Sequence, residues 1–221
     1  MNNISSFYGL LILISFVVIL LLREILVYKE NKTAKYFLTP MITFSIASMV
    51  VYSFFAQGPH LYSALILLAL LFALIADTLL MVIEVSLLPY GLVFFLLTHV
   101  LYVAAFSQIY VFNWWNILIA GALGLYLIFF YKRIKDKVGS LKIPVLIYMT
   151  ILSTMVFLAV SSVGAEVSSK NILIAAGALL FAVSDSILAT NEFVNKIPHS
   201  TVYTWATYGP AQMLIALSCL M

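Results

Sequence analysis

The chain has 221 residues, of which 65% are hydrophobic and only 9% are charged, and its mean hydropathy is +1.16. Water-soluble domains carry roughly 25% charged residues, so this composition excludes a soluble globule. The net charge of +3 is too small to indicate an acidic partner by itself.

Eight apolar runs follow one another along the chain, centred near residues 17, 48, 72, 100, 123, 153, 180 and 211. Each is about 20 residues long, which is the length of a helix that crosses a bilayer. The runs do not alternate as barrel strands do, and lipid offers a bare backbone no hydrogen-bond partner. We therefore predict an all-α integral membrane protein with eight transmembrane helices, forming a single polytopic domain over residues 1–221.

The first run follows "MNNISS", which has no Lys or Arg, and no cleavage-site pattern comes after the run. We expect it to be retained as a helix and not removed as a signal peptide. Ten of the eleven Lys and Arg residues flank the loops after the first, fifth and seventh runs, and Lys170 alone lies on the other side. The positive-inside rule makes the basic side cytoplasmic and leaves both termini outside. We expect a bacterial inner-membrane protein and, because orientation explains these charges, no nucleic-acid partner.

The third and seventh runs contain similar polar motifs, "ADTLLMVIE" and "SDSILATNE". Asp77 and Asp185 are 108 residues apart, and so are Glu84 and Glu192. A duplicated four-helix unit would explain this spacing and would give a parallel repeat about an axis along the membrane normal. Chance similarity between two apolar helices is the alternative. The predicted repeats are residues 1–110 and 111–221.

The two aspartates are the first candidates for function. Asp77 lies about six residues, or about 9 Å, before the cytoplasmic end of its run, and Asp185 lies at a similar depth. Burying a carboxylate in a bilayer costs at least about 2.5 kcal/mol, so we expect both to face an interior cavity. Close together and away from water, two carboxyl groups share one proton. Glu84 and Glu192 are expected at the membrane interface.

Further polar side chains lie on neighbouring runs. His99 and Tyr102 in the fourth run are three residues apart. Tyr208 and Gln212 in the eighth run are four apart, so each pair shares one helix face. Ser184 could instead bond to its own helix, and Lys35 could act only as an orientation charge. For each residue, a purely structural role is the alternative. The candidates for substrate binding are His99, Tyr102, Tyr208, Gln212, Ser184 and Lys35.

These residues favour acid–base chemistry. The chain has three histidines and only His99 lies in an apolar run, so we expect no metal site and no cofactor. No phosphate-binding P-loop and no nucleophile elbow are present. An acid paired with a carboxylate can cleave an acetal-like bond, as in glycosidases. In a vinyl-ether lipid, protonation of the β-carbon would give an oxocarbenium ion, and water addition would then release an aldehyde.

Four motifs resemble one known family: "ADTLLM", "YGLVFFLLTHVLYVAAF", "AAGALLFAVSDSILA" and "YGPAQMLI". They are similar to motifs of the YhhN-type lysoplasmalogenases, a family of eight-helix membrane proteins. The resemblance implies hydrolysis of the vinyl ether of a lysophospholipid, lysoplasmalogen, to a fatty aldehyde and glycerophosphoethanolamine or glycerophosphocholine. The residues at the family's motif positions are Asp77, His99, Asp185, Tyr208 and Gln212.

The chain departs from the family pattern at two positions. Ala76 precedes the first aspartate, where the family has Gly, and Thr39 precedes Pro40, where the family has a basic residue. Lys35 lies about one helical turn before Thr39.

Two other functions would also use buried aspartates. A proton-coupled transporter or lipid flippase could carry protons on them between two access states. A structural membrane protein could use them only to join helices. Release of aldehyde would indicate the hydrolase, and transport of lipid without chemical change would indicate the transporter or flippase. If Asn variants of the aspartates lose only stability, the role is structural. The sequence leaves the oligomeric state open.

Overall fold

The computed structural model describes residues 3–82 and 87–221, with the side chains of residues 3–6 left out. Within these ranges the chain forms eight α-helices and two short 3-10 turns, which confirms the predicted all-α class. The helices are α1 (Asn3–Tyr28), α2 (Lys32–Gln57), α3 (Leu61–Met81), α4 (Leu88–Ser107), α5 (Trp115–Ile134), α6 (Lys142–Ala165), α7 (Ser169–Phe193) and α8 (Ser200–Leu217).

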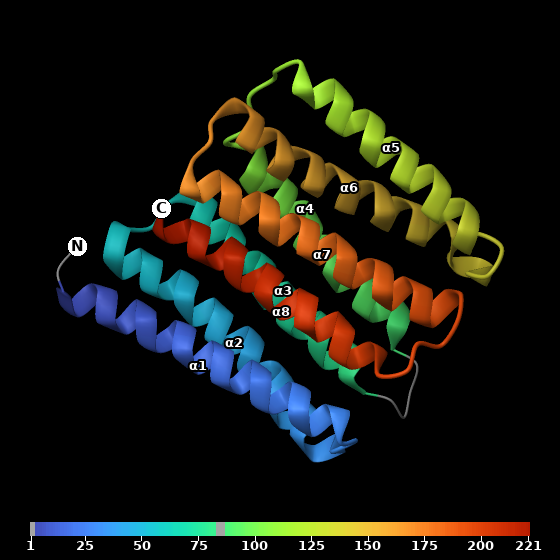
Figure 1. The fold of residues 1–221 in the computed structure, drawn as a ribbon, viewed down its shortest axis with the longest axis horizontal. Helices are drawn as coiled ribbons and strands as arrows, with labels where there is room; N and C mark the ends of the chain where they lie inside the picture. Colours follow the sequence, from blue (N-terminus) through green and yellow to red (C-terminus); the bar gives the residue numbers. More distant parts are fainter. Residues whose placement is uncertain (1–2, 83–86) are drawn as a thin grey trace.

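Helices α1 to α7 are long and apolar enough to cross a bilayer, and among the described residues these are the seven that meet this test. The chain is therefore a multi-pass integral membrane protein. Helix α8 has 18 residues and contains Pro210. It lies within the bundle beside α7 (Figure 1). The eighth membrane span therefore stays a prediction.

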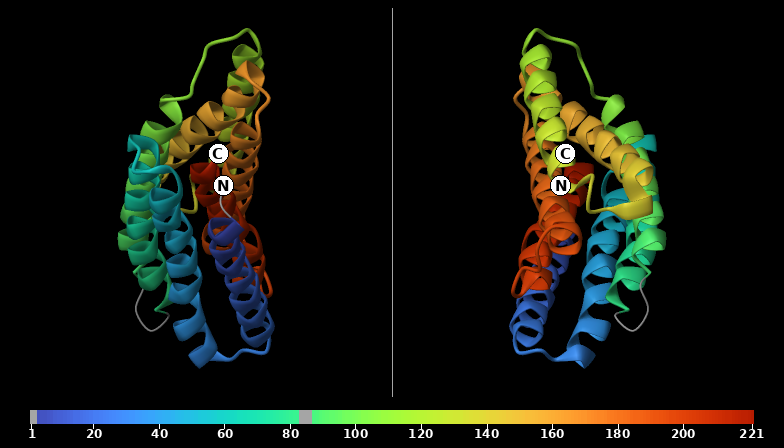
Figure 2. Two further views of the ribbon diagram at one scale, coloured as in Figure 1. Left: turned by 90° about the vertical axis from the view of Figure 1, so that its left-hand side faces the viewer. Right: turned by 90° about the vertical axis from the view of Figure 1, so that its right-hand side faces the viewer.

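The bundle is flattened into two layers (Figure 2). One layer contains α2, α3 and α4, and the other contains α1, α8 and α7. Helix α6 packs against both α4 and α7, while α5 packs against α6 at the edge of the bundle. The α1–α2, α5–α6 and α7–α8 loops lie together at the end opposite the two termini (Figure 1). The basic loops thus share one face, as the sequence predicts.

Contacts in the two halves of the chain correspond closely. Helix α2 packs against α1, α3 and α8, and α6 packs against α5, α7 and α4. The hairpin of α3 and α4 likewise corresponds to that of α7 and α8. This arrangement is what a duplicated four-helix unit would produce. The duplication itself stays a prediction.

Apolar side chains cover the outside of the bundle while many polar ones lie inside. Phe44 is 70% exposed and Phe55 is 85% exposed. Such rings would be buried in a soluble protein, but they suit contact with lipid tails. Thr43, His99 and Gln212 are at most 1% exposed. Interior polar groups need partners in the bundle, because lipid supplies none.

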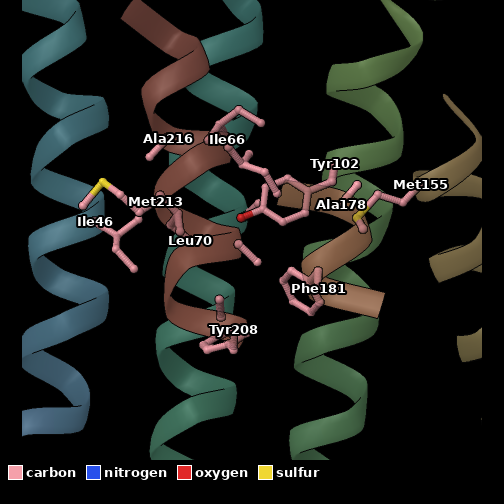
Figure 3. Close-up of a cluster of buried hydrophobic side chains, with 14 of the residues drawn as sticks. Ile46, Ile66, Leu70, Tyr102, Met155, Ala178, Phe181, Tyr208, Met213 and Ala216 are labelled. Carbon is pink, nitrogen blue, oxygen red and sulfur yellow. The ribbon is translucent and has the colours of Figure 1, made fainter. Parts of the chain in front are cut away.

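Close packing between α7 and α8 depends on Gly177. A Cβ at this position would lie 2.8 Å from the carbonyl oxygen of Ala211 and 2.8 Å from Cγ1 of Ile215. The two helices therefore approach each other at a distance that only glycine allows. Phe181, one turn further along α7, packs in the centre of the bundle near Tyr102 and Tyr208 (Figure 3).

The aspartates lie at different distances from the ends of their helices. Asp77 is about one turn before the end of α3 at Met81, and Asp185 is about two turns before the end of α7 at Phe193. The predicted distance of about six residues from the helix end is therefore too long for Asp77 and too short for Asp185. Both carboxyl groups are nevertheless buried, at 5% and 9% exposed.

Candidate functional site

Both aspartates line one cavity of about 200 Å³. Its walls come from α1, α2, α3, α4, α7 and α8, and it lies toward the basic-loop end of the bundle. Ligand pockets usually measure about 300–1,000 Å³, so this one suits a small polar group better than a lipid chain.

Asp77 accepts two hydrogen bonds from hydroxyl groups. Thr43 Oγ1, on α2, donates to Asp77 Oδ2 at 2.7 Å. Tyr208 OH, on α8, donates to the same oxygen at 3.1 Å. Three helices thereby fix the position of this carboxyl group.

Asp185 has a different pair of partners. Tyr148 OH, on α6, donates to Asp185 Oδ2 at 2.6 Å. His99 Nε2, on α4, lies 3.7 Å from the same oxygen. Two hydroxyl donors thus share one oxygen of Asp77, whereas one oxygen of Asp185 lies near a hydroxyl and an imidazole.

The tautomer of neutral His99 follows from its other contact. His99 Nδ1 is 2.6 Å from the carbonyl oxygen of Phe95. A carbonyl only accepts hydrogen bonds, so Nδ1 must carry the hydrogen, and Nε2 of the neutral ring presents its lone pair. Nε2 is buried and has no hydrogen-bond partner among the described residues. At 3.7 Å it is beyond hydrogen-bond distance of Asp185 Oδ2, so a proton could pass between the two groups only after they move closer together.

A second hydrogen-bonded chain leads from Asp77 away from the cavity. Gln212 Nε2 donates to Tyr208 OH at 3.1 Å, and Tyr102 OH donates to Gln212 Oε1. In Figure 3 the hydroxyl of Tyr102 points from α4 toward α8. Tyr102 and Gln212 therefore hold Tyr208 in position from behind.

The structure divides the predicted site residues into two groups. The cavity wall includes Lys35, Asp77, Ser184, Asp185 and Tyr208. The wall residues described for this cavity do not include the other three candidates, which lie behind it: His99, Tyr102 and Gln212.

Ser184 and Phe181 shape the side of the site formed by α7. Ser184 Oγ donates to the carbonyl oxygen of Thr204 on α8 at 3.1 Å, so it bonds to the neighbouring helix and not to its own. The ring of Phe181 packs edge-on against both His99, at 4.7 Å between centroids, and Tyr208, at 5.2 Å. One aromatic side chain thus contacts a partner of each aspartate.

Three residues of the site are missing from the sequence prediction. Thr43 and Tyr148 bind the aspartates, and Arg23 lies in the cavity wall. Thr39 and Thr43 are four residues apart on an apolar helix, which places two hydroxyl groups on one face. This spacing was a usable signal that α2 contributes to the site. Arg23 was read only as an orientation charge, but it is 0% exposed.

Of the two glutamates in the repeated motifs, Glu192 lies one residue before the end of α7 at Phe193. Glu192 lines the edge of the cavity, and Lys196 Nζ lies 3.4 Å from its carboxylate, one turn away. Glu84 falls outside the described residues. Within residues 3–82 and 87–221, no three His, Cys, Asp or Glu side chains gather as metal ligands would.

Comparison with known proteins places these motifs in a family. A profile of the YhhN family matches residues 34–219. The bovine protein named lysoplasmalogenase TMEM86A is 32% identical over 162 residues, and its human counterpart is 28% identical over 162. Both alignments cover 72% of this chain and 66% of the relative. Human lysoplasmalogenase TMEM86B is 32% identical over 130 residues, which is 59% of this chain and 53% of that protein. No solved structure matches the chain.

Proposed function

The chain belongs to the YhhN family, and on that premise we propose that it hydrolyses the vinyl ether of lysoplasmalogen. The products would be a fatty aldehyde and glycerophosphoethanolamine or glycerophosphocholine. The observation that carries this proposal is that Asp77 and Asp185 line the same small cavity inside a membrane protein. The names of the bovine and human relatives agree with it.

In the proposed reaction the two aspartates have different roles. Asp77 accepts two hydroxyl hydrogen bonds, and the guanidinium group of Arg23 lies in the same wall. These groups favour a carboxylate, which would stabilise the positive charge of an oxocarbenium ion. Asp185 accepts one such bond among the described residues and faces the lone pair of His99. It is therefore the better candidate for the acid.

The proposed steps conserve atoms and charge. Asp185 donates its proton to the β-carbon of the vinyl ether, and the resulting oxocarbenium ion is stabilised by Asp77. Water adds to this ion and gives up a proton, which returns to Asp185 directly or through His99. The hemiacetal then collapses to the aldehyde and the free glycerol hydroxyl. No step requires a cofactor or metal.

The substrate's alkenyl chain would lie outside the cavity. A wide groove of about 750 Å³ on the lipid side of α1 and α2 is lined by Tyr36 and Pro40. These residues are neighbours in sequence of Lys35 and Thr39, which line the cavity. The groove thus offers an apolar surface beside a polar site, which is what a single-chain phospholipid needs.

The topology proposed here has eight spans in one domain. Helix α8 is about 27 Å long at 1.5 Å per residue, which is close to the roughly 30 Å hydrocarbon core. Its polar residues Tyr208 and Gln212 are buried within the bundle, so they are not exposed to lipid. The basic end would be cytoplasmic, with both termini outside and the protein in a bacterial inner membrane. The cavity would then open toward the inner leaflet.

The test is aldehyde release from lysoplasmalogen by protein purified in detergent. The wild type should release aldehyde, and Asp77→Asn and Asp185→Asn should each lose most of that activity. Glu192→Gln, at the edge of the same cavity, should affect the rate far less and serves as the control. If both Asn variants keep wild-type turnover, the mechanism is wrong. Lipid movement into proteoliposomes without aldehyde release would instead favour a transporter or flippase.

A further inference from the structure

Arg23 is a fully buried cation in the wall of the cavity. Its Nε donates to Thr39 Oγ1 at 3.3 Å, and its Nη1 lies 2.6 Å from Glu24 Oε1. Nη1 also donates to the carbonyl oxygen of Thr201 at 3.5 Å. The guanidinium group lies 4.7 Å from the ring centroid of Trp205. Contacts on α1, α2 and α8 thus hold this side chain in place.

One nitrogen of this fixed group has no partner in the described part of the chain. Nη2 of Arg23 is buried and makes no hydrogen bond to any described residue. A buried donor without an acceptor is costly, and the cost is larger when the group is charged. The guanidinium group cannot lose its charge, and its flat array of donors matches phosphate and carboxylate oxygens. A fixed guanidinium with an unused donor in a cavity wall is therefore suited to an anionic ligand.

We infer that Arg23, assisted by Lys35, binds the phosphate group of the lipid substrate. This inference rests on the proposed function, in which the substrate's only constant anionic group is a phosphodiester. Lys35 lies in the same wall, about one turn before Thr39 on α2. Binding the phosphate there would hold the polar end of the lipid in the cavity, beside Asp77.

Phosphate binding differs from a role limited to Asp77. If Arg23 only balanced the charge of that carboxylate, its loss would affect every substrate equally. If it binds phosphate, its loss should weaken only ligands that carry phosphate. Two ethers with saturated chains, which cannot be cleaved, separate these roles: 1-O-alkyl-lysophosphatidylethanolamine and 1-O-alkylglycerol. They differ in the phosphoethanolamine group.

The experiment measures the Kd of both lipids for purified wild-type protein, Arg23→Gln, Arg23→Lys and Lys35→Gln. Because a hydrogen bond to a charged group is lost, Arg23→Gln should weaken the phospholipid about tenfold or more. The affinity of Arg23→Gln for 1-O-alkylglycerol should stay within about twofold of the wild type, because this lipid has no phosphate group for Arg23 to bind. Arg23→Lys keeps the charge but not the flat donor array, so its Kd for the phospholipid should lie between those of the wild type and Arg23→Gln. Arg133→Gln, an exposed arginine at the same end of the bundle, should change neither.

Equal weakening of both lipids by Arg23→Gln would overturn the inference. If Arg23→Gln fails to fold, Lys35→Gln carries the test, because that side chain is only half-buried. A selective loss of phospholipid binding in Lys35→Gln supports the site, and no selective loss overturns it. Inorganic phosphate is the second probe: if it competes with the phospholipid, the site recognises phosphate itself, and if only the lipid binds, it recognises the headgroup. Because these lipids are not cleaved, the result stands even if vinyl-ether hydrolysis is not observed.

Discussion

The two halves of the bundle place an aspartate in equivalent surroundings but give it different partners. Asp77 on α3 is contacted from α2 and α8, and Asp185 on α7 is contacted from α6 and α4. The helices that supply the partners correspond in the predicted repeat. His99 and Tyr208 are 109 residues apart, which is one more than the 108 that separate the aspartates.

The chemical difference lies in those partners and in the outermost helices. Tyr208 donates a hydrogen bond to Asp77, whereas His99 presents a lone pair toward Asp185. Helix α1 also packs against α8 and brings Arg23 to the first aspartate. Its counterpart α5 buries only Asn116 and Ile134 in the described part of the chain. The two aspartates therefore have different chemical neighbours, which are two hydroxyl groups for Asp77 and one hydroxyl group and an imidazole for Asp185.

The largest expected effect tests this difference directly. At neutral pH, Asp77→Asn and Asp185→Asn should each lower kcat/KM by about 10²–10⁴-fold, which is the usual contribution of a general acid or base. Solvent hydronium can replace a missing acid, so the residual rate of Asp185→Asn should rise about tenfold for each unit of falling pH. Asp77→Asn lacks the cation-stabilising carboxylate, which hydronium cannot replace.

The measurement is kcat/KM between pH 5 and 8, corrected for spontaneous hydrolysis of the vinyl ether. Rescue of Asp77→Asn at low pH, with none for Asp185→Asn, would reverse the assignment. Identical profiles for the two variants would mean that the aspartates share one proton equally.

A smaller effect is expected from the tyrosines. Tyr208→Phe removes a hydrogen bond to a carboxylate, worth about 1.5–3 kcal/mol, and should lower kcat/KM by about 10–100-fold. Tyr148→Phe removes a bond to a protonated carboxyl group, worth about 0.5–1.5 kcal/mol, and should cost about 2–10-fold. Both changes delete one oxygen, so each variant controls for the other. A larger loss for Tyr148→Phe would contradict the proposed charge states.

The smallest effects concern stability and separate the packed helices from the edge of the bundle. Gly177→Ala places a Cβ 2.8 Å from the backbone of α8 and should destabilise the protein by about 1–3 kcal/mol. In Gly124→Ala on α5 the added Cβ meets no atom of the described residues within 4 Å, so the change should be neutral or stabilising by up to about 1 kcal/mol. Thermal unfolding in detergent measures both. An equal loss of stability would show that α5 is covered in the membrane by a contact that this chain alone does not provide.

Much of the site was predictable because charged residues are costly in lipid. Asp77 and Asp185 are conspicuous in apolar runs, and the structure places both in one cavity. The positions of Tyr102 and Gln212 behind Tyr208 were not predictable, because nearly uniform apolar runs do not reveal how each helix is rotated. The predicted depth of the aspartates was also wrong, because α3 and α7 do not end where the apolar runs predict.

Arg23 was counted in the sequence among the basic residues that flank the first loop, but its position next to a loop did not predict that it is buried. It lies five residues before the end of α1 at Tyr28, where an arginine commonly extends to the interface. Only the contacts of α1 with α2 and α8 show that it is fully buried and directed at the cavity. In the structure its Nη1 lies 2.6 Å from Oε1 of the next residue, Glu24.

The sequence by itself determined the class of the protein, the approximate positions of its helices and the identity of its two buried acids. Hydrophobic length and the energetic cost of isolated charge are local properties that any apolar run carries. The tertiary structure decided which groups meet each acid, because partners come from helices more than 30 residues apart. Helix rotation and packing, set by close contacts such as the one at Gly177, make one aspartate a neighbour of hydroxyls and arginine and the other a neighbour of imidazole.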